Sequence, residues 1–226
     1  LAVFSNTGVE FASHSERFSG QKNDPHLNKE LVEYARQQYG DPDEIIWYER
    51  PFRKTLRQLR AGQGWNYSEN NIKRYLKSYG ITAPVKYTSH HHSHAAAGYY
   101  TSPFRNATIV CIDSIGEFET LTVWEGNGDK LKKVWSQGYP NSVGLWYSAM
   151  TQRIGLKPNE DEYILMGMAA YGDYNKYYAD ILNDMFSKMP GRDGLPVKFK
   201  HNLHRGCKWW RPELTSEQDM FDIAAA

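Results

Sequence analysis

The segment from residue 106 to residue 137 constrains the fold more than any other part of the chain. "NATIVCID" is the continuous apolar run of a buried strand, and "FETLTVWE" alternates apolar and polar residues with a period of two. The "NGDK" sequence that follows is a strong hairpin turn before "LKKVWSQ". The sequence therefore predicts three consecutive antiparallel strands.

Helical and extended patterns flank these three strands. The chain opens with a hairpin pattern, further strands are expected at "EIIWYE" and "PVKYT", and a helix is expected around "ENNIKRYLKSYG". Asn23 or Asp24 is expected to cap a helix that begins near Pro25 and ends at Gly40. Ser142 is expected to start the helix of "SVGLWYSAMTQRIG". Together these patterns predict an α/β fold with a mixed sheet.

Composition excludes several classes of protein. The chain of 226 residues carries 27 basic and 26 acidic side chains, so no global field is available to hold a nucleic acid or an anionic membrane face. Cys111 and Cys207 form no CxxC pair, which disfavours a disulfide framework, a thiolate zinc site and a dithiol redox motif. No apolar run approaches the roughly 20 residues that span a bilayer. We therefore expect a cytoplasmic protein without membrane segments.

Four of the eight histidines lie within five residues, in "SHHHSHAAAGYY". His90 and His94 form an HxxxH pattern, which places two imidazoles on one face of a helix. The helix must begin near Ser89 for this geometry, and the alanines after His94 favour its continuation. Asp113, at the end of the "NATIVCID" strand, is a candidate third ligand. Two histidines and a carboxylate with open positions suit iron, manganese or zinc.

The histidine cluster also has a simpler interpretation as a polar patch that satisfies the free backbone amides of a helix start. The pattern lacks the glutamate of a metalloprotease HExxH, which argues against a peptidase. His91 and His92 are expected to point to other faces of the helix, toward solvent or, for one of them, toward a ligand or substrate. We take His91 as a catalytic candidate, together with Glu117, which is expected to orient a ligand or a substrate hydroxyl.

Two glycine-bearing segments, "DSIGEFET" and "MGMAAYG", are candidate phosphate sites. Glycine lets backbone amides approach a phosphate, which makes Gly116, Gly167 and Gly172 candidates for cofactor binding. Glu162 lies on a segment that is expected to form a helix facing a nucleotide. A hairpin turn also explains Gly116, and a helix C-cap also explains Gly172.

Four segments, in this order, resemble the carbamoyltransferase family of the NodU/CmcH/TobZ type. They are "SERFSGQKND" at 15–24, "HHHSHAAAGYYTSPF" at 90–104, "CIDSIGEFETLTVW" at 111–124 and "SVGLWYSAMTQRIGLKPNEDEYILMGMAAYG" at 142–172. The closing "DIAAA" is similar to the DIAASVQ helix of the family. The resemblance thus extends over the whole chain.

The resemblance implies both a fold and a reaction. The fold is an actin/hexokinase/sugar-kinase-like (ribonuclease H-like) mixed sheet with flanking helices. The reaction transfers a carbamoyl group from carbamoyl phosphate, through an ATP-derived carbamoyl adenylate, to a hydroxyl of a small-molecule acceptor. His90, His94 and Asp113 match the family's ligands for a divalent metal ion, with Fe²⁺ expected first and Mn²⁺ or Zn²⁺ next. Arg17 and Lys22 match its anion contacts, and a homodimer is left open.

The same resemblance implies that residues 1–226 are a partial N-terminal carbamoyltransferase domain. A first phosphate-binding strand and turn would precede Leu1. The second half of the fold, a further ligating aspartate and a C-terminal YrdC-like domain that makes the adenylate would follow Ala226. We therefore expect a fold that is incomplete at both ends and a piece that does not catalyse the full reaction by itself.

The sequence departs from the family pattern at several positions. Gly20 stands where the family usually has arginine, Asn23 where it has histidine, Ile164 where it has lysine and Ala170 where it has proline. Losing a cation beside a phosphate removes a charge-assisted hydrogen bond worth about 1.5–3 kcal/mol. Two alternatives therefore stay open: a tRNA threonylcarbamoyltransferase-like enzyme and a divergent, non-catalytic nucleotide- or metal-binding protein.

Overall fold

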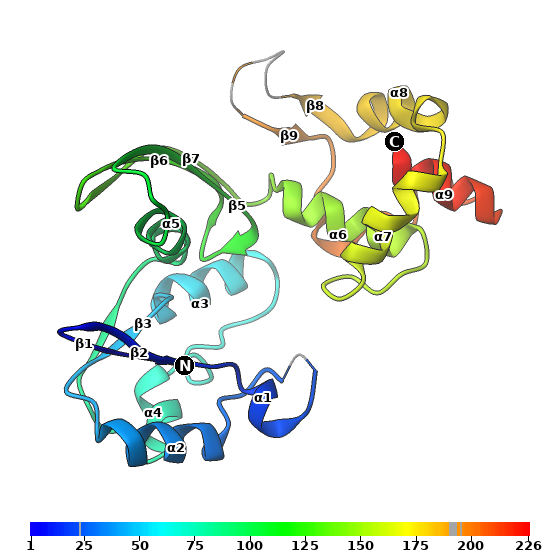
Figure 1. Cartoon of the computed structure of the whole chain (residues 1–226). Coiled ribbons are helices and arrows are strands. Elements are labelled where there is room, and N and C mark those ends of the chain that lie inside the picture. The colour runs from blue at the N-terminus through cyan, green and yellow to red at the C-terminus, as the bar shows by residue number, and fades with distance from the viewer. Residues whose placement is uncertain (23, 190–193, 195) are drawn as a thin grey trace. The chain divides into compact units, whose positions relative to one another are not determined.

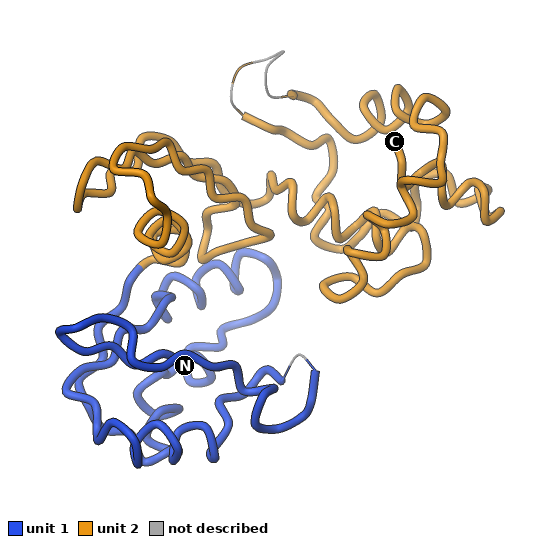
Figure 2. Tube along the Cα trace, viewed as in Figure 1, with its two compact units in different colours: residues 1–88 blue, residues 89–226 orange. Residues whose placement is uncertain are grey.

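The structure is a computed structural model that describes residues 1–22, 24–189, 194 and 196–226. The chain divides into two units, residues 1–88 and residues 89–226 (Figure 2). We describe each unit by itself. Among the described residues, no helix has both the length and the apolar character that crossing a membrane requires.

The first unit contains one hairpin, one parallel strand pair and four helices within its described residues. In chain order these are β1 (Ala2–Ser5), β2 (Gly8–Ala12), α1 (Glu16–Ser19), α2 (Lys29–Tyr39), β3 (Ile45–Trp47), α3 (Pro51–Arg60), α4 (Ile72–Lys77) and β4 (Val85–Tyr87). β1 pairs antiparallel with β2, and β3 pairs parallel with β4. Val32, Leu76 and Ile81 form the buried core of this unit.

Helix α2 starts later than the sequence indicates. Its N-cap is Asn28, whose side chain accepts a hydrogen bond of 3.1 Å from the amide of Leu31. Asp24 instead accepts from the amide of His26, and Asn23 lies outside the described residues. The amide of Leu27 donates to the Tyr75 hydroxyl at 2.7 Å, which holds the chain out of helical geometry just before Asn28. The expected start near Pro25 is therefore wrong by about one turn, because a contact with a distant residue decides it.

The second unit begins with the histidine helix and continues into the predicted strands. Its elements are α5 (His90–Tyr100), β5 (Asn106–Gly116), β6 (Glu119–Asn127), β7 (Lys130–Gly138), α6 (Val143–Arg153), α7 (Glu162–Met168), η1 (Ala169–Tyr171), α8 (Tyr174–Met185), β8 (Phe186–Lys188), β9 (Lys198–Phe199), η2 (Leu203–Arg205) and α9 (Glu217–Ala225) (Figure 1). The order β5–β6–β7 is antiparallel throughout, which confirms the three predicted strands.

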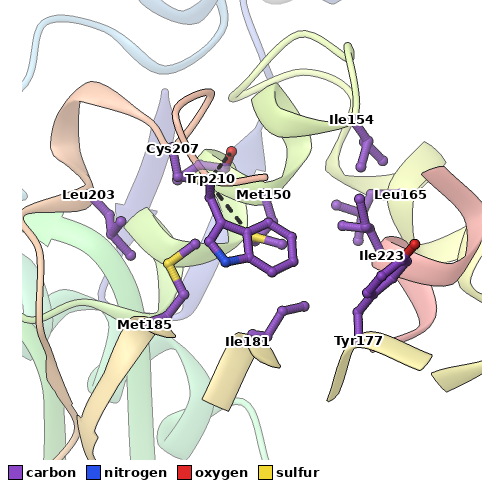
Figure 3. Packing of buried hydrophobic residues seen from close by; sticks show 11 residues of the cluster. Met150, Ile154, Leu165, Tyr177, Ile181, Met185, Leu203, Cys207, Trp210 and Ile223 are labelled. Carbon is purple, nitrogen blue, oxygen red and sulfur yellow. Dashed lines mark hydrogen bonds between the residues drawn. The ribbon is translucent and has the colours of Figure 1, made fainter. Parts of the chain in front are cut away.

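Two separate clusters of buried side chains hold the second unit together. Helix α5 packs on one face of the β5–β7 sheet, where Ala95, Cys111 and Trp124 are buried (Figure 1). Helices α6 to α9 surround a larger apolar cluster that includes Met150 and Trp210 (Figure 3). Burial of such side chains, each worth about 1.5–3 kcal/mol, is the main force that assembles these helices.

The described strands and helices confirm an α/β chain. The expected mixed sheet is not formed, because the strands belong to four sheets in the described part of the chain, each entirely parallel or entirely antiparallel. The parallel pair β3–β4 lies in the first unit, whereas the β5–β7 sheet lies in the second. The actin/hexokinase-like arrangement stays a prediction.

Candidate metal centre

Helix α5 presents its histidines at the helical spacing that the sequence predicts. Ser89 occupies the N-cap position in an extended conformation, and the helix begins at His90. Within the described chain, the Ser89 hydroxyl makes no capping hydrogen bond. His90 and His94 are one turn apart, and their ring centroids lie 4.7 Å from each other.

His90, His94 and Asp113 converge as the sequence predicts. The Nε2 atoms of the two histidines are 3.0 Å apart. Asp113 Oδ2 lies 2.8 Å from His90 Nε2 and 3.8 Å from His94 Nε2. We call these three side chains the triad. The side chain of His94 is about half exposed (54%), so the triad opens to solvent on that side.

We had expected Asp113 at the end of a strand, but it lies in an interruption of the sheet. β5 pairs regularly with β6 up to Ile112 opposite Leu121, and pairing resumes at Gly116 opposite Glu119. The residues between are shifted out of register, as in a β-bulge, which redirects a side chain locally. The strand itself continues to Gly116, so the carboxylate projects from within β5.

The start of helix α6 fixes the backbone of Asp113. The Ser142 hydroxyl donates to the Asp113 carbonyl at 3.0 Å and accepts from the amide of Leu145, which confirms Ser142 as the start of α6. A Cβ atom on Gly144 would lie 2.7 Å from the backbone nitrogen of Ser114, so only glycine permits this contact. The Ser114 amide donates to Asp113 Oδ1, which orients the carboxylate.

The electrostatics of the triad favour an ionised carboxylate. The hydrogen bond from His90 lowers the pKa of Asp113 below its ordinary value, and the Ser114 amide lowers it further, while partial burial acts in the opposite direction. An ionised carboxylate is the form that binds a metal ion. The triad is therefore electrostatically prepared for a cation.

The geometry of the triad fits one divalent metal ion. One potential ligand atom from each residue lies within 4.8 Å of the others. Two ligand atoms bound about 2.1 Å from the same ion are separated by about 3.0–3.4 Å for angles of 90–109°. The observed separations of 2.8, 3.0 and 3.8 Å bracket this range. Three ligands on one side also leave coordination positions open for a substrate.

We had expected His91 and His92 to point toward solvent, but the structure places them otherwise. His91 is fully buried, and its Nδ1 and Nε2 atoms lie 2.9 Å from Thr122 Oγ1 and 3.1 Å from the Glu119 carbonyl. Burial lowers the pKa of His91, because a charged ring is poorly solvated there. His92 is half-buried, with its ring 5.3 Å from that of Trp124. The sheet beneath α5 therefore covers both rings.

Gly116 and Glu117 lie directly beside the histidines. A Cβ atom on Gly116 would approach His90 Cδ2 to 2.4 Å and His91 Cδ2 to 2.8 Å, so the glycine makes room for the two imidazoles. This close packing explains the glycine without a phosphate. Glu117 is only 3% exposed, and its φ of 56° is a left-handed conformation that is uncommon for a residue with a side chain. A buried carboxyl group therefore lies in the β5–β6 turn, four residues after Asp113.

The candidate nucleotide residues of the "MGMAAYG" region have contacts within the fold. Glu162 begins α7, and its Oε1 atom accepts from the Ser148 hydroxyl at 2.8 Å and from the Asn159 amide at 2.6 Å. Gly167 is exposed inside α7, where its amide falls within the helical hydrogen-bond ladder. A Cβ atom on Gly172 would overlap the Phe221 carbonyl oxygen at 2.0 Å.

Gly172 is the C-cap residue of η1, as the alternative explanation expects, but without the left-handed conformation that usually favours glycine there. Its φ of −102° lies outside the left-handed region, so the glycine is needed for the close approach of α9 and not for a turn. Gly20 shows the opposite case. Its φ of 67° is left-handed, its amide donates to the Glu16 carbonyl, and it caps α1 at a position where glycine is favoured over arginine.

Arg17 and Lys22 are exposed in the first unit, whereas the triad belongs to the second. Their assignment to an anion stays a prediction.

Gly144 and Thr122 are the residues around the triad that sequence reasoning missed. For Thr122, alternation along β6 was the available signal, because it places this polar side chain on the same face as Trp124 and toward α5.

Comparison with known proteins identifies related chains. The model of the family described as "Carbamoyltransferase N-terminus" matches residues 5–208. An uncharacterized protein of Synechocystis sp. is 33% identical over 201 residues, which cover 76% of this chain and 32% of the relative. The nodulation protein NolNO of Sinorhizobium fredii is 30% identical over 154 residues, which cover 63% of this chain and 22% of that protein.

A more distant relative shows the same partial coverage. An uncharacterized protein of Methanocaldococcus jannaschii is 27% identical over 182 residues, with 79% of this chain and 33% of the relative covered. The chain thus spans about a third or less of the length of these relatives. The family match includes the triad and the elements that hold it.

Proposed function

This chain belongs to the carbamoyltransferase N-terminus family, and on that premise we propose that it supplies the metal-binding part of an O-carbamoyltransferase. The observation that carries the proposal is the convergence of His90, His94 and Asp113 within the matched residues. The proposed reaction moves a carbamoyl group from carbamoyl phosphate, through an ATP-derived carbamoyl adenylate, to a hydroxyl of a small molecule.

The triad is proposed to hold Fe²⁺, with Mn²⁺ or Zn²⁺ as alternatives. When bound, such an ion supplies Lewis acidity toward the carbamoyl group or the acceptor hydroxyl. The chain's own residues prepare this chemistry. The Ser142 hydroxyl and the Ser114 amide hold Asp113 in the bulge, and the opening beside His94 gives a substrate access to the triad.

Glu117 is proposed to orient the acceptor hydroxyl and to accept its proton. Its turn follows directly after the strand that carries Asp113, and its burial places a carboxyl group in a site from which water is largely excluded. In such surroundings a carboxylate acts as an effective hydrogen-bond acceptor and general base. The left-handed conformation at this position is consistent with a functional constraint on the turn.

ATP and carbamoyl phosphate are proposed as substrates on the strength of the family resemblance. Arg17 and Lys22 are the proposed anion contacts, and Gly116, Glu162, Gly167 and Gly172 the proposed nucleotide contacts. The internal contacts of Glu162, Gly116 and Gly172 give each of these residues a role in the fold as well. The complete reaction is proposed to need the further parts of the longer relatives, so residues 1–226 alone are expected to be inactive.

Metal analysis and transfer assays on the complete protein test this proposal. The double variant His90→Ala/His94→Ala is expected to lose both the bound divalent ion and carbamoyl transfer. His92→Ala is the matched control, because it removes a histidine from the same helix that packs on Trp124 instead of facing Asp113. Unchanged metal content and transfer in the double variant would show that the triad is only a hydrogen-bonded cluster.

A non-catalytic nucleotide- or metal-binding protein is the second candidate. Gly20 favours it, because its left-handed conformation suits glycine at a position where the family usually carries arginine. Calorimetry with ATP on the complete protein, followed by a turnover assay, separates the two functions. Tight ATP binding without product favours the second candidate. A tRNA-modifying relative is less well supported, because binding RNA needs a basic surface, which the net charge of +1 does not indicate.

A further inference from the structure

His91 is held from two sides by strand β6. The Glu119 carbonyl oxygen is an acceptor only, so the His91 Nε2 atom, 3.1 Å away, carries the proton and donates. In a neutral ring the Nδ1 atom is then an acceptor, and Thr122 Oγ1 lies 2.9 Å from it. The ring is fully buried, so no water replaces either partner. Both nitrogens are therefore committed to the sheet.

Trp124 fixes the direction of the second hydrogen bond. Its indole Nε1 atom is a donor only and lies 2.8 Å from Thr122 Oγ1. The threonine hydroxyl accepts from the indole and donates its own hydrogen to His91 Nδ1. The result is a directed chain of hydrogen bonds from Trp124 through Thr122 to His91 and on to the Glu119 carbonyl. All of the buried groups in this chain are satisfied.

We propose that His91 is a positioning residue, whose two hydrogen bonds to β6 set the rotation of α5 and thereby direct His90 and His94 toward Asp113. This inference rests on the proposed metal centre. It also revises the expectation that His91 takes part in catalysis, because a ring with both nitrogens bonded to the sheet has no lone pair or proton left for a substrate or a metal ion.

We call the two hydrogen bonds between His91 and β6 the anchor. The geometry of the helix explains how the anchor directs His90 and His94. Successive residues on a helix are about 100° apart, so fixing the ring of His91 on the sheet fixes the direction in which His90 points. Gly116 strengthens the constraint, because the rings of His90 and His91 both lie where its Cβ atom would be. Groups that hydrogen-bond directly to metal ligands typically change metal affinity about 10-fold to 100-fold when they are lost, and we expect an effect of this order for His91.

Titration of the complete protein with Co²⁺ alone tests the anchor. Thr122→Val keeps the shape of the side chain but removes the hydroxyl that donates to His91 Nδ1. We expect it to weaken Co²⁺ binding about 10-fold or more and to change the visible absorption of the bound ion. Thr122→Ser keeps the hydroxyl and should restore both. Thr151→Val is the matched control, because Thr151 is equally buried and hydrogen-bonded, but to Tyr147 within α6.

A second variant separates positioning from catalysis. His91→Gln retains a donor for the Glu119 carbonyl but loses the aromatic ring, and it should weaken Co²⁺ binding and carbamoyl transfer together. Loss of transfer with unchanged Co²⁺ affinity and spectrum would overturn the inference, because it would make His91 a catalytic residue. Unchanged Co²⁺ affinity and spectrum in both Thr122→Val and His91→Gln would overturn it as well.

The tautomer of His91 gives a measurement that needs no substitution. In ¹⁵N-labelled protein, we expect a neutral His91 ring with its proton on Nε2, and a ring protonated on Nδ1 alone would overturn the inference. A failure of the proposed function is recognised separately. If the wild-type protein and His94→Ala bind Co²⁺ equally, the metal centre is wrong, whereas a wild-type site lost in His94→Ala but unaffected by the anchor variants refutes only the role of His91.

Discussion

The two halves of the second unit are stabilised by different forces. Beneath α5, buried polar groups make directed hydrogen bonds, as His91 does with Thr122 and Glu119. Around Trp210, apolar side chains from α6, α8 and α9 pack against one another (Figure 3). Hydrogen bonds depend on direction, whereas burial of apolar surface depends mainly on area. Substitutions in the first region should therefore change the geometry of the triad, and those in the second should change stability.

Trp210→Ala should have the largest effect of any single substitution that we consider. The indole is 2% exposed, and its Nε1 atom donates to Asp184 at 2.9 Å. Truncation leaves a large cavity and an unpaired acceptor, so we expect a loss of about 3–5 kcal/mol in the free energy of unfolding, measured with denaturant. Trp209→Ala is the adjacent control, because Trp209 is 50% exposed. Equal losses in the two variants would contradict the assignment of this core.

A bound metal ion should stabilise the region around α5, which carries the triad. At a free concentration 100 times its dissociation constant, an ion that binds only the folded state adds about 2.7 kcal/mol. We expect the melting temperature of the complete protein to rise with Co²⁺ and to fall again with a chelator. In His94→Ala both shifts should be nearly absent, whereas Trp209→Ala should retain them. A Co²⁺-dependent shift of full size in His94→Ala would place the ion elsewhere.

Gly116→Ala tests how closely α5 is packed on the sheet. Its added Cβ atom would meet the imidazoles of His90 and His91, so we expect a loss of about 1–3 kcal/mol in the free energy of unfolding and weaker Co²⁺ binding. Gly98→Ala provides the opposite control within α5. A Cβ atom there meets open space among the described residues, so alanine should stabilise the helix by about 0.5–1 kcal/mol. Similar effects of the two substitutions would show that the rings can move aside.

The same contrast explains what the sequence could predict. The histidine pair follows from local spacing, because HxxxH needs only one helix. Asp113 could be predicted as a candidate from the strand that follows, but not the bulge and the Ser142 contact that hold it. The α6–α9 core depends on contacts between distant residues. Arg153, for example, is 9% exposed and donates to the carbonyls of Trp210, Arg211 and Leu214, about sixty residues further along the chain. No local pattern reveals such a contact, which is why the packing of this core could not be predicted from the sequence.

His91 illustrates what the sequence could not predict at the site itself. Its position on α5 follows from the spacing, but its burial depends on the strand that lies beneath the helix. The ring of His91 is buried because it lies against β6, where it contacts Thr122 and the Glu119 carbonyl, and these residues follow His91 by about thirty positions. The sequence predicted the three residues of the triad and left open which neighbouring histidine lies against the sheet.

The smallest expected effect is a change in acid stability between α8 and α9. The Ser216 hydroxyl and the Tyr177 hydroxyl lower the pKa of Asp219 to about 2, with a smaller contribution from Lys176. A carboxyl group whose pKa is lower in the folded state stabilises the protein above its unfolded pKa of about 3.8, and this contribution is lost as the pH falls toward 2. Asp219→Asn should therefore reduce the dependence of unfolding on pH between about 4 and 2.

Asp129→Asn, an exposed change in the β6–β7 turn, is the control and should leave this dependence as it is. Because Asp219 belongs to α9 and the core region and not to the region around α5, Co²⁺ affinity above pH 5 should not change in either variant. A parallel loss of Co²⁺ binding in Asp219→Asn would show that the two regions are energetically coupled.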